Sequence, residues 1–125
     1  MSVRFFVIVM TTIGVTACGG YNSPSSPSVT PTQAPAGSTM VTISSGASAQ
    51  TTTAFGTNPL TIATGTTISW LNGDNTVHTS TADGNQWSSG DIPPGGRFNF
   101  TFASAGRFTY RCQIHPNMTG TILVQ

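Results

Sequence analysis

The chain has 125 residues, of which only 6% are charged, with 4 Lys or Arg against 3 Asp or Glu. This length fits one folded domain. The sparse charge excludes a nucleic-acid-binding protein, which needs a clustered basic face, and it predicts weak long-range steering of any partner.

Residues 1–18 have the pattern of an export signal. Arg4 gives the segment a positively charged N-terminal region. The apolar run 5–13 that follows is shorter than the roughly 20 apolar residues that span a bilayer. The run ends in Val-Thr-Ala-Cys, which resembles the cleavage box of a bacterial lipoprotein with Cys18 as the lipidated N-terminus. An ordinary secretory signal that happens to end near a cysteine is the alternative. We expect an exported protein that faces the cell envelope or periplasm and is held to a bacterial membrane by lipid at Cys18.

Residues 19–38 are rich in Pro, Ser and Thr and contain almost no apolar side chains. Such a composition cannot bury a core, so it predicts a disordered linker between the signal peptide and a domain at 39–125.

From residue 39 onward, short apolar segments are separated by Gly, Pro and Asn. Several of them alternate apolar and polar side chains, as Phe98 and Phe100 do with Asn99 and Thr101, and this period of two is typical of half-buried strands. Many short strands with turns between them predict an all-β sandwich or barrel. The expected strands are 40–43, 59–62, 66–71, 98–102, 108–112 and 121–124.

Four side chains between residues 78 and 118 indicate a metal site. Cys112, His115 and Met118 follow one another at intervals of three residues, and His78 is the only other histidine. Two imidazoles, a thiolate and a weak thioether are the ligands of a blue-copper electron-transfer site. Zinc is the main competitor, but it prefers four firm ligands, and a thioether is a poor one.

The position of Cys112 in the chain favours metal ligation. Its only possible disulfide partner in the chain is Cys18, and lipid at Cys18 would leave it unpaired. A metal bond explains how a thiol escapes oxidation in an oxidising compartment. A strand ends at Cys112 and the next begins near Thr119, so one tight loop presents three ligands while His78 arrives from another turn. We expect one Cu(I)/Cu(II) ion per chain.

Residues 39–125 resemble a cupredoxin of the plastocyanin, pseudoazurin and amicyanin group. The resemblance rests on the segments 65–72, 96–102, 105–112 and 118–121, and the short ligand loop is most similar to the amicyanin type. It implies a Greek-key β-sandwich or barrel of the cupredoxin type and a one-electron transfer function.

Two positions depart from the family pattern. The family usually has Asn after the first histidine, where its side chain ties the two ligand loops together; here Thr79 stands there, so we expect a weaker tie or one made differently. Pro often precedes the second histidine, whereas Ile114 keeps a backbone N–H. We predict that this N–H donates a hydrogen bond to the sulfur of Cys112 and raises the reduction potential.

We expect an electron carrier and not an enzyme. The chain lacks the further histidines of a multicopper oxidase and the second loop cysteine of a binuclear site. A monomer would exchange electrons with a c-type cytochrome, an oxidase or a reductase, through an exposed edge of His115 that Pro93, Pro94 and Pro116 surround. A copper carrier or storage protein of the cell envelope is the alternative, although Met-rich and His-rich tracts are absent.

Overall fold

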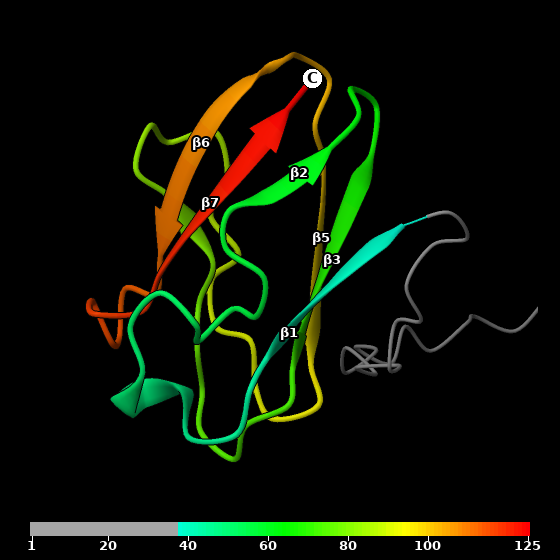
Figure 1. The fold of residues 1–125 in the computed structure, drawn as a ribbon. Coiled ribbons are helices and arrows are strands. Elements are labelled where there is room, and N and C mark those ends of the chain that lie inside the picture. Colours follow the sequence, from blue (N-terminus) through cyan, green and yellow to red (C-terminus); the bar gives the residue numbers. More distant parts are fainter. Residues whose placement is uncertain (1–37) are drawn as a thin grey trace, which may run out of the picture.

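The computed structural model describes residues 38–125. The expected signal peptide, Cys18 and all of the expected linker except Ser38 lie outside these residues. No helix in the described part of the chain is long and apolar enough to span a bilayer. Its elements, shown in Figure 1, are β1 (Thr39–Ile43), the 3-10 turn η1 (Ala47–Ala49), β2 (Leu60–Ile62), β3 (Thr67–Asn72), β4 (Thr81–Ala82), β5 (Arg97–Thr101), β6 (Gly106–Arg111) and β7 (Thr119–Val124).

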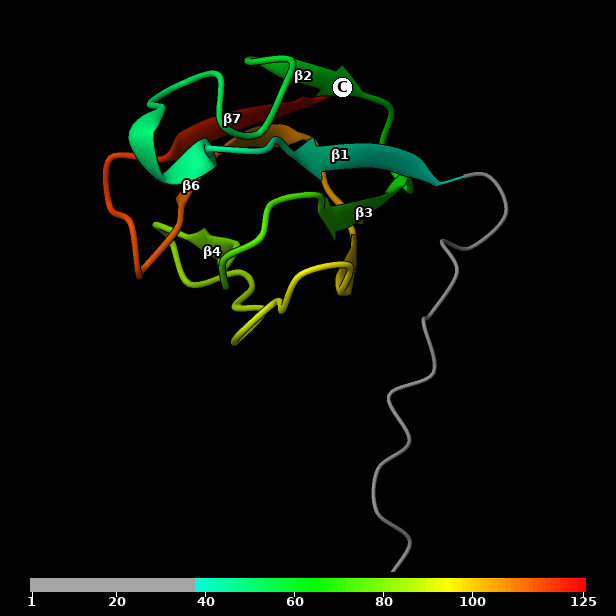
Figure 2. The ribbon, with the colours of Figure 1, turned by 90° about the horizontal axis from the view of Figure 1, so that it is seen from below.

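The strands form two mixed sheets, which confirms the all-β expectation. One sheet has the order β1-β3-β5 and the other the order β2-β7-β6-β4. In each sheet one edge strand pairs in parallel, β1 with β3 and β2 with β7, while the remaining pairs are antiparallel. Figure 2 shows β2, β7 and β6 in one layer above β1 and β3 in the other, so that each sheet can bury one face against its neighbour.

The predicted strands form where β-branched and aromatic side chains alternate with polar ones. In β7, the alternating residues Gly120, Ile122 and Val124 are buried while those between them are half-buried. Branched side chains suit a pleated, half-buried surface, which explains why this segment adopts a strand. The five-residue strand β5 ends at Thr101, and Phe102 lies just beyond it with its side chain in the core.

An aromatic cluster fills the space between the sheets. Trp70 of β3 is fully buried, and its ring centroid lies 5.7 Å from those of Trp87 and Tyr110. Trp87 also packs at 5.2 Å against Phe102 and at 5.1 Å against Phe100. Such aromatic pairs add about 0.5–1.5 kcal/mol each beyond the area that they bury. The cluster thus joins both sheets to the 82–92 segment that leads away from β4.

Candidate metal centre

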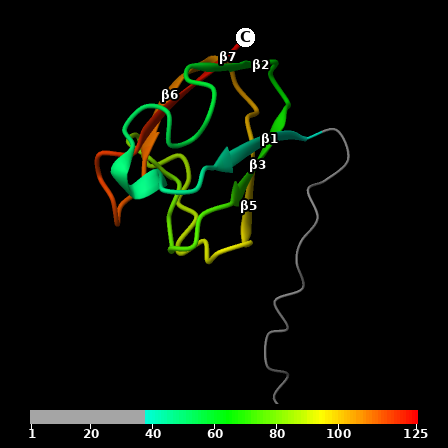
Figure 3. The ribbon, with the colours of Figure 1, turned by 60° about the horizontal axis from the view of Figure 1, so that its bottom comes forward.

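Three of the expected ligands belong to the loop that joins β6 to β7. Cys112 follows β6 directly, and Met118 immediately precedes β7. The backbone closes the loop, because the N–H of Cys112 donates to the carbonyl of Met118 at 3.1 Å and the N–H of Met118 donates to the carbonyl of His115 at 3.0 Å. Cys112 and Met118 are fully buried. Figures 1 and 3 show this loop beside η1, at one end of the sandwich.

His78 reaches the same place from the connection between β3 and β4. Its backbone forms an isolated antiparallel bridge with Ile92, through hydrogen bonds of 3.2 and 2.8 Å. The side chain is fully buried. This bridge fixes the direction in which the imidazole leaves the chain.

The side chains of His78, Cys112 and His115 converge. The Sγ atom of Cys112 lies 3.9 Å from Nδ1 of His78 and 3.8 Å from Nδ1 of His115, and the two Nδ1 atoms are 3.2 Å apart. A point equidistant from the three atoms lies about 2.1 Å from each, close to the bonds of about 2.0–2.1 Å to nitrogen and about 2.3 Å to thiolate that Zn²⁺ makes. The three side chains can therefore hold one metal ion.

Thr79 ties the two ligand loops together. Its backbone N–H donates to Sγ of Cys112 at 3.3 Å, and its hydroxyl lies 3.9 Å from the same sulfur. The hydroxyl oxygen also accepts a hydrogen bond from the backbone N–H of Gln113 at 2.8 Å. The tie is thus made by a hydroxyl and an amide of one residue, in place of the Asn side chain that the family pattern would supply.

The predicted hydrogen bond from Ile114 to the sulfur is not present among residues 38–125. The donor to Sγ is Thr79, which approaches from the facing loop, and the side chain of Ile114 is 47% exposed. Ile114 therefore lies on the outer side of its loop, while the sulfur is enclosed by the residues across from it.

Sequence reasoning missed Asp74, which holds the imidazole of His78. Oδ2 of Asp74 lies 2.9 Å from Nε2 of His78, and both side chains are buried. The hydrogen bond with His78, joined by two backbone N–H donors, holds the pKa of Asp74 well below its usual range. The available signal was the acid four residues before the histidine, since a ligating histidine usually hydrogen-bonds a carboxylate, a carbonyl or water through its other nitrogen.

Trp87 and β4 were also missed, and both support the segment that carries His78. The indole N–H of Trp87 donates to the hydroxyl of Ser80 at 3.0 Å, and the N–H of Ser80 donates to the hydroxyl of Ser89 at 2.8 Å. β4 then pairs with β6, the strand that ends just before Cys112. These contacts hold His78 in register with the loop that it faces.

His115 is the most accessible of the four expected ligands. It is half-buried, and Pro93, Pro94 and Pro116 are exposed. Residues 113–118 carry no Asp, Glu, Lys or Arg. The loop that carries His115 is therefore uncharged.

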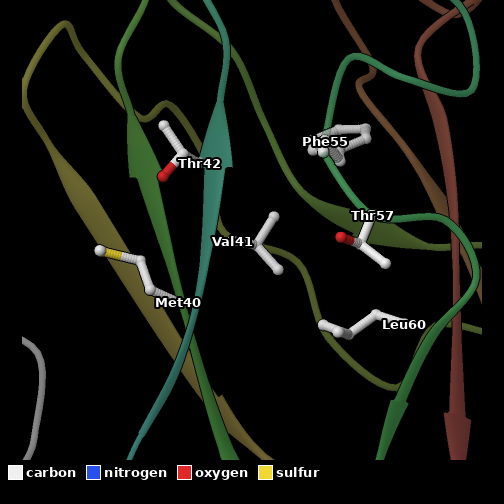
Figure 4. Close-up of a pocket in the computed structure, with 7 residues that line it drawn as sticks. Met40, Val41, Thr42, Phe55, Thr57 and Leu60 are labelled. Atoms are coloured by element: carbon white, nitrogen blue, oxygen red, sulfur yellow. The ribbon is translucent and has the colours of Figure 1, made fainter.

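A shallow recess of about 240 Å³ lies elsewhere, between β1 and the segment that leads into β2. Figure 4 shows its lining, which consists of Met40, Val41, Thr42, Phe55, Thr57 and Leu60, together with Gly56. None of the four expected ligands belongs to this lining.

No family model and no curated protein matches the chain. Solved structures do match it. A purple cupredoxin from Nitrosopumilus maritimus is 29% identical, with a TM-score of 0.62 over 69% of this chain and 98% of that one. The Cu(I) form of an amicyanin variant is 23% identical, with a TM-score of 0.60 over 71% of this chain and 83% of that one. A second, reduced amicyanin variant is 21% identical, with a TM-score of 0.63 over 74% and 87%.

The fold is that of the cupredoxins. This confirms the fold expected from the sequence, including the resemblance to amicyanin, whose structures align over most of their own length. On this cupredoxin scaffold, His78, Cys112 and His115 form the cluster of side chains that can bind a metal.

Proposed function

We propose that this protein transfers single electrons through one copper ion bound by His78, Cys112 and His115, with Met118 as a weak fourth ligand. The observation that carries the proposal is the convergence of two Nδ1 atoms and one Sγ atom at separations of 3.2 to 3.9 Å. Bound copper would supply a Cu(II)/Cu(I) couple, for which thiolate and thioether favour Cu(I) and imidazole serves both states. An amicyanin structure of the same fold is a Cu(I) form, and this supports copper as the metal.

The protein's own residues would keep the site unchanged as the electron arrives and leaves. Thr79 fixes the sulfur of Cys112, Asp74 fixes the ring of His78, and the backbone bonds of the loop fix Met118. Burial of Cys112, His78 and Met118 excludes water from three of the four ligands. Little rearrangement would then accompany a change of oxidation state, which favours fast electron transfer.

The half-buried imidazole of His115 would be the route for electrons to and from a partner. Ile114 and Pro116 are exposed beside it in an uncharged loop, so contact with a partner would not depend on charges of this loop. A redox protein such as a c-type cytochrome, an oxidase or a reductase fits this surface. We propose an electron carrier and not an enzyme, acting as a monomer.

Export and lipid anchoring at Cys18 remain part of the proposal, on the strength of the sequence pattern at 1–18. Replacing Cys18 with Ala in the full chain should release the protein from the membrane fraction or stall its processing. Unchanged partitioning of the variant into membranes would contradict the anchor and leave the copper site untouched.

Comparing electron exchange with copper exchange tests this function against copper storage. The copper-loaded full chain should reduce and oxidise a c-type cytochrome quickly, and it should lose its ion to a strong chelator slowly, because three ligands are buried. Rapid loss of copper together with slow electron exchange would favour the carrier or storage alternative and contradict our proposal.

A further inference from the structure

The carboxylate of Asp74 is a fully occupied hydrogen-bond acceptor inside the protein. The residue is 6% exposed. One oxygen, Oδ1, accepts the backbone N–H groups of Gly46 at 3.1 Å and Asn75 at 2.8 Å. The other, Oδ2, accepts the hydroxyl of Thr76 at 3.2 Å and contacts Nε2 of His78 at 2.9 Å. Donors on both oxygens favour the ionised form.

A buried Asn72 keeps this carboxylate in place. The Oδ1 atom of Asn72 accepts the backbone N–H of Asp74 at 2.9 Å, and its Nδ2 group donates to the carbonyls of Thr76 and Ile92 at 2.7 and 2.8 Å. The donors to Asp74 also come from two separate parts of the chain, since Gly46 precedes η1. The position of Asp74 is therefore set by the fold and not by His78 alone.

The contact between Asp74 and His78 determines which ring nitrogen carries the proton. An ionised carboxylate can only accept hydrogen bonds, so Nε2 of His78 must be the donor. The hydroxyl of Thr76, 3.1 Å from the same nitrogen, donates its own proton to Asp74 and is free to accept from Nε2. In a neutral imidazole with its proton on Nε2, Nδ1 has a free lone pair. This is the nitrogen that faces Cys112 and His115.

We propose that Asp74 is a positioning residue that fixes the Nε2–H tautomer of His78 and thereby makes Nδ1 available to the metal. The inference rests on the proposed function only in naming copper as the ion, because the tautomer exists in the metal-free protein. Outer partners of this kind orient a ligating imidazole and raise its basicity.

A second consequence concerns the two oxidation states. The ring of His78 contacts the carboxylate of Asp74 at 2.9 Å, so the negative charge would act through this ring on a bound copper ion. It would stabilise Cu(II), which carries one more positive charge, more than Cu(I). Removing this charge should therefore shift the equilibrium toward Cu(I).

The metal-free full chain gives the first test. Nitrogen-15 NMR of its imidazoles should show a protonated Nε2 and an unprotonated Nδ1 for His78 near neutral pH. A protonated Nδ1 in the wild type would overturn the proposal, and this measurement depends on no variant and no metal.

The second test compares Asp74→Asn with Asp83→Asn. Asp83 is exposed and lies 3.6 Å from Arg111, so its variant removes the same charge from the surface. An amide at 74 has one oxygen, which cannot serve both the two backbone donors and Nε2 of His78. We expect Asp74→Asn to bind Cu(II) and Zn²⁺ roughly 10–100-fold more weakly. We also expect a tenfold shift toward Cu(I), equivalent to about 59 mV in the positive direction.

The outcomes separate this inference from the proposed function. A wild type that binds no copper would refute the function, while the NMR result on the metal-free protein would still decide the tautomer. A wild type that binds copper, with the two variants equal to each other in affinity and potential, would overturn the role of Asp74 alone. Circular dichroism of both variants shows whether each is folded, and an unfolded Asp74→Asn leaves the wild-type tautomer as the deciding result.

Discussion

The backbone N–H of Thr79 donates a hydrogen bond of 3.3 Å to the sulfur of Cys112, although the two residues are 33 positions apart. Thr79 comes immediately after His78, so a single dipeptide supplies one ligand and the donor to another. The hydroxyl of Thr79 accepts the N–H of Gln113 at 2.8 Å, which leaves its own proton free to point toward the sulfur. The two halves of the site are thereby joined before any metal is bound.

Removing this hydroxyl should lower both the stability and the reduction potential. Thr79→Val keeps the shape of the side chain but leaves the N–H of Gln113 without its acceptor, so we expect a loss of about 1 kcal/mol in the free energy of unfolding. It also withdraws a hydroxyl that lies 3.9 Å from the thiolate, which disfavours the electron-rich Cu(I) state. Denaturant unfolding and voltammetry measure the two effects. Thr79→Ser should behave like the wild type, and a Val variant equal to Ser in both measurements would refute the role of the hydroxyl.

Ile114→Pro should leave the reduction potential unchanged. The sequence alone suggested that the N–H of Ile114 bonds the sulfur, in which case proline would lower the potential. In the structure the backbone donor is Thr79, so proline removes nothing from the sulfur. Voltammetry of the variant and the wild type decides between the two. A drop of tens of millivolts, where about 59 mV is a tenfold change, would show that Ile114 does bond the sulfur.

The buried Tyr110 predicts a loss of stability at alkaline pH. Burial raises the pKa of its hydroxyl well above the ordinary value of about 10. Because the unfolded chain ionises at the ordinary pKa and the folded chain does not, the contribution of Tyr110 to folding stability is constant below about pH 10 and falls as the pH rises above it. Denaturant unfolding of the metal-free protein between pH 8 and 12 should show this decline. Tyr110→Phe should flatten it, and an equally steep decline in the variant would assign the effect to another group.

The strands and the ligand spacing could be predicted from the sequence because both depend on local pattern. Alternating side chains located β5 and β6, a short apolar segment located β7, and the run from Cys112 to Met118 placed three expected ligands in one short loop. β4 has two residues, too few to show any period. Trp87 lies in a polar stretch, and only the tertiary fold reveals that its ring packs against Trp70 and Phe102.

The residues that contact the expected ligands could be identified only from the structure. Asp74 lies four residues before His78 and Asp83 five residues after it, so the spacing suggested an acidic partner for His78 but did not decide between the two. The donor to Cys112 was expected on its own loop, at Ile114, and it came from Thr79 across the site. The contact between Thr79 and Cys112 joins segments distant in sequence, and the contact between Asp74 and His78 depends on the shape of a turn. Residue periodicity encodes neither.

The visible spectrum of the full chain with one equivalent of Cu(II) tests the central claim most directly. Coordination by the Cys112 thiolate and two imidazoles should give an intense blue absorption that saturates at one ion per chain and bleaches on addition of one electron. Cys112→Ser, with the same fold and both histidines, should remain nearly colourless. A wild type without this absorption, or a serine variant that keeps it, would contradict the assignment of His78, Cys112 and His115 as a copper electron-transfer site.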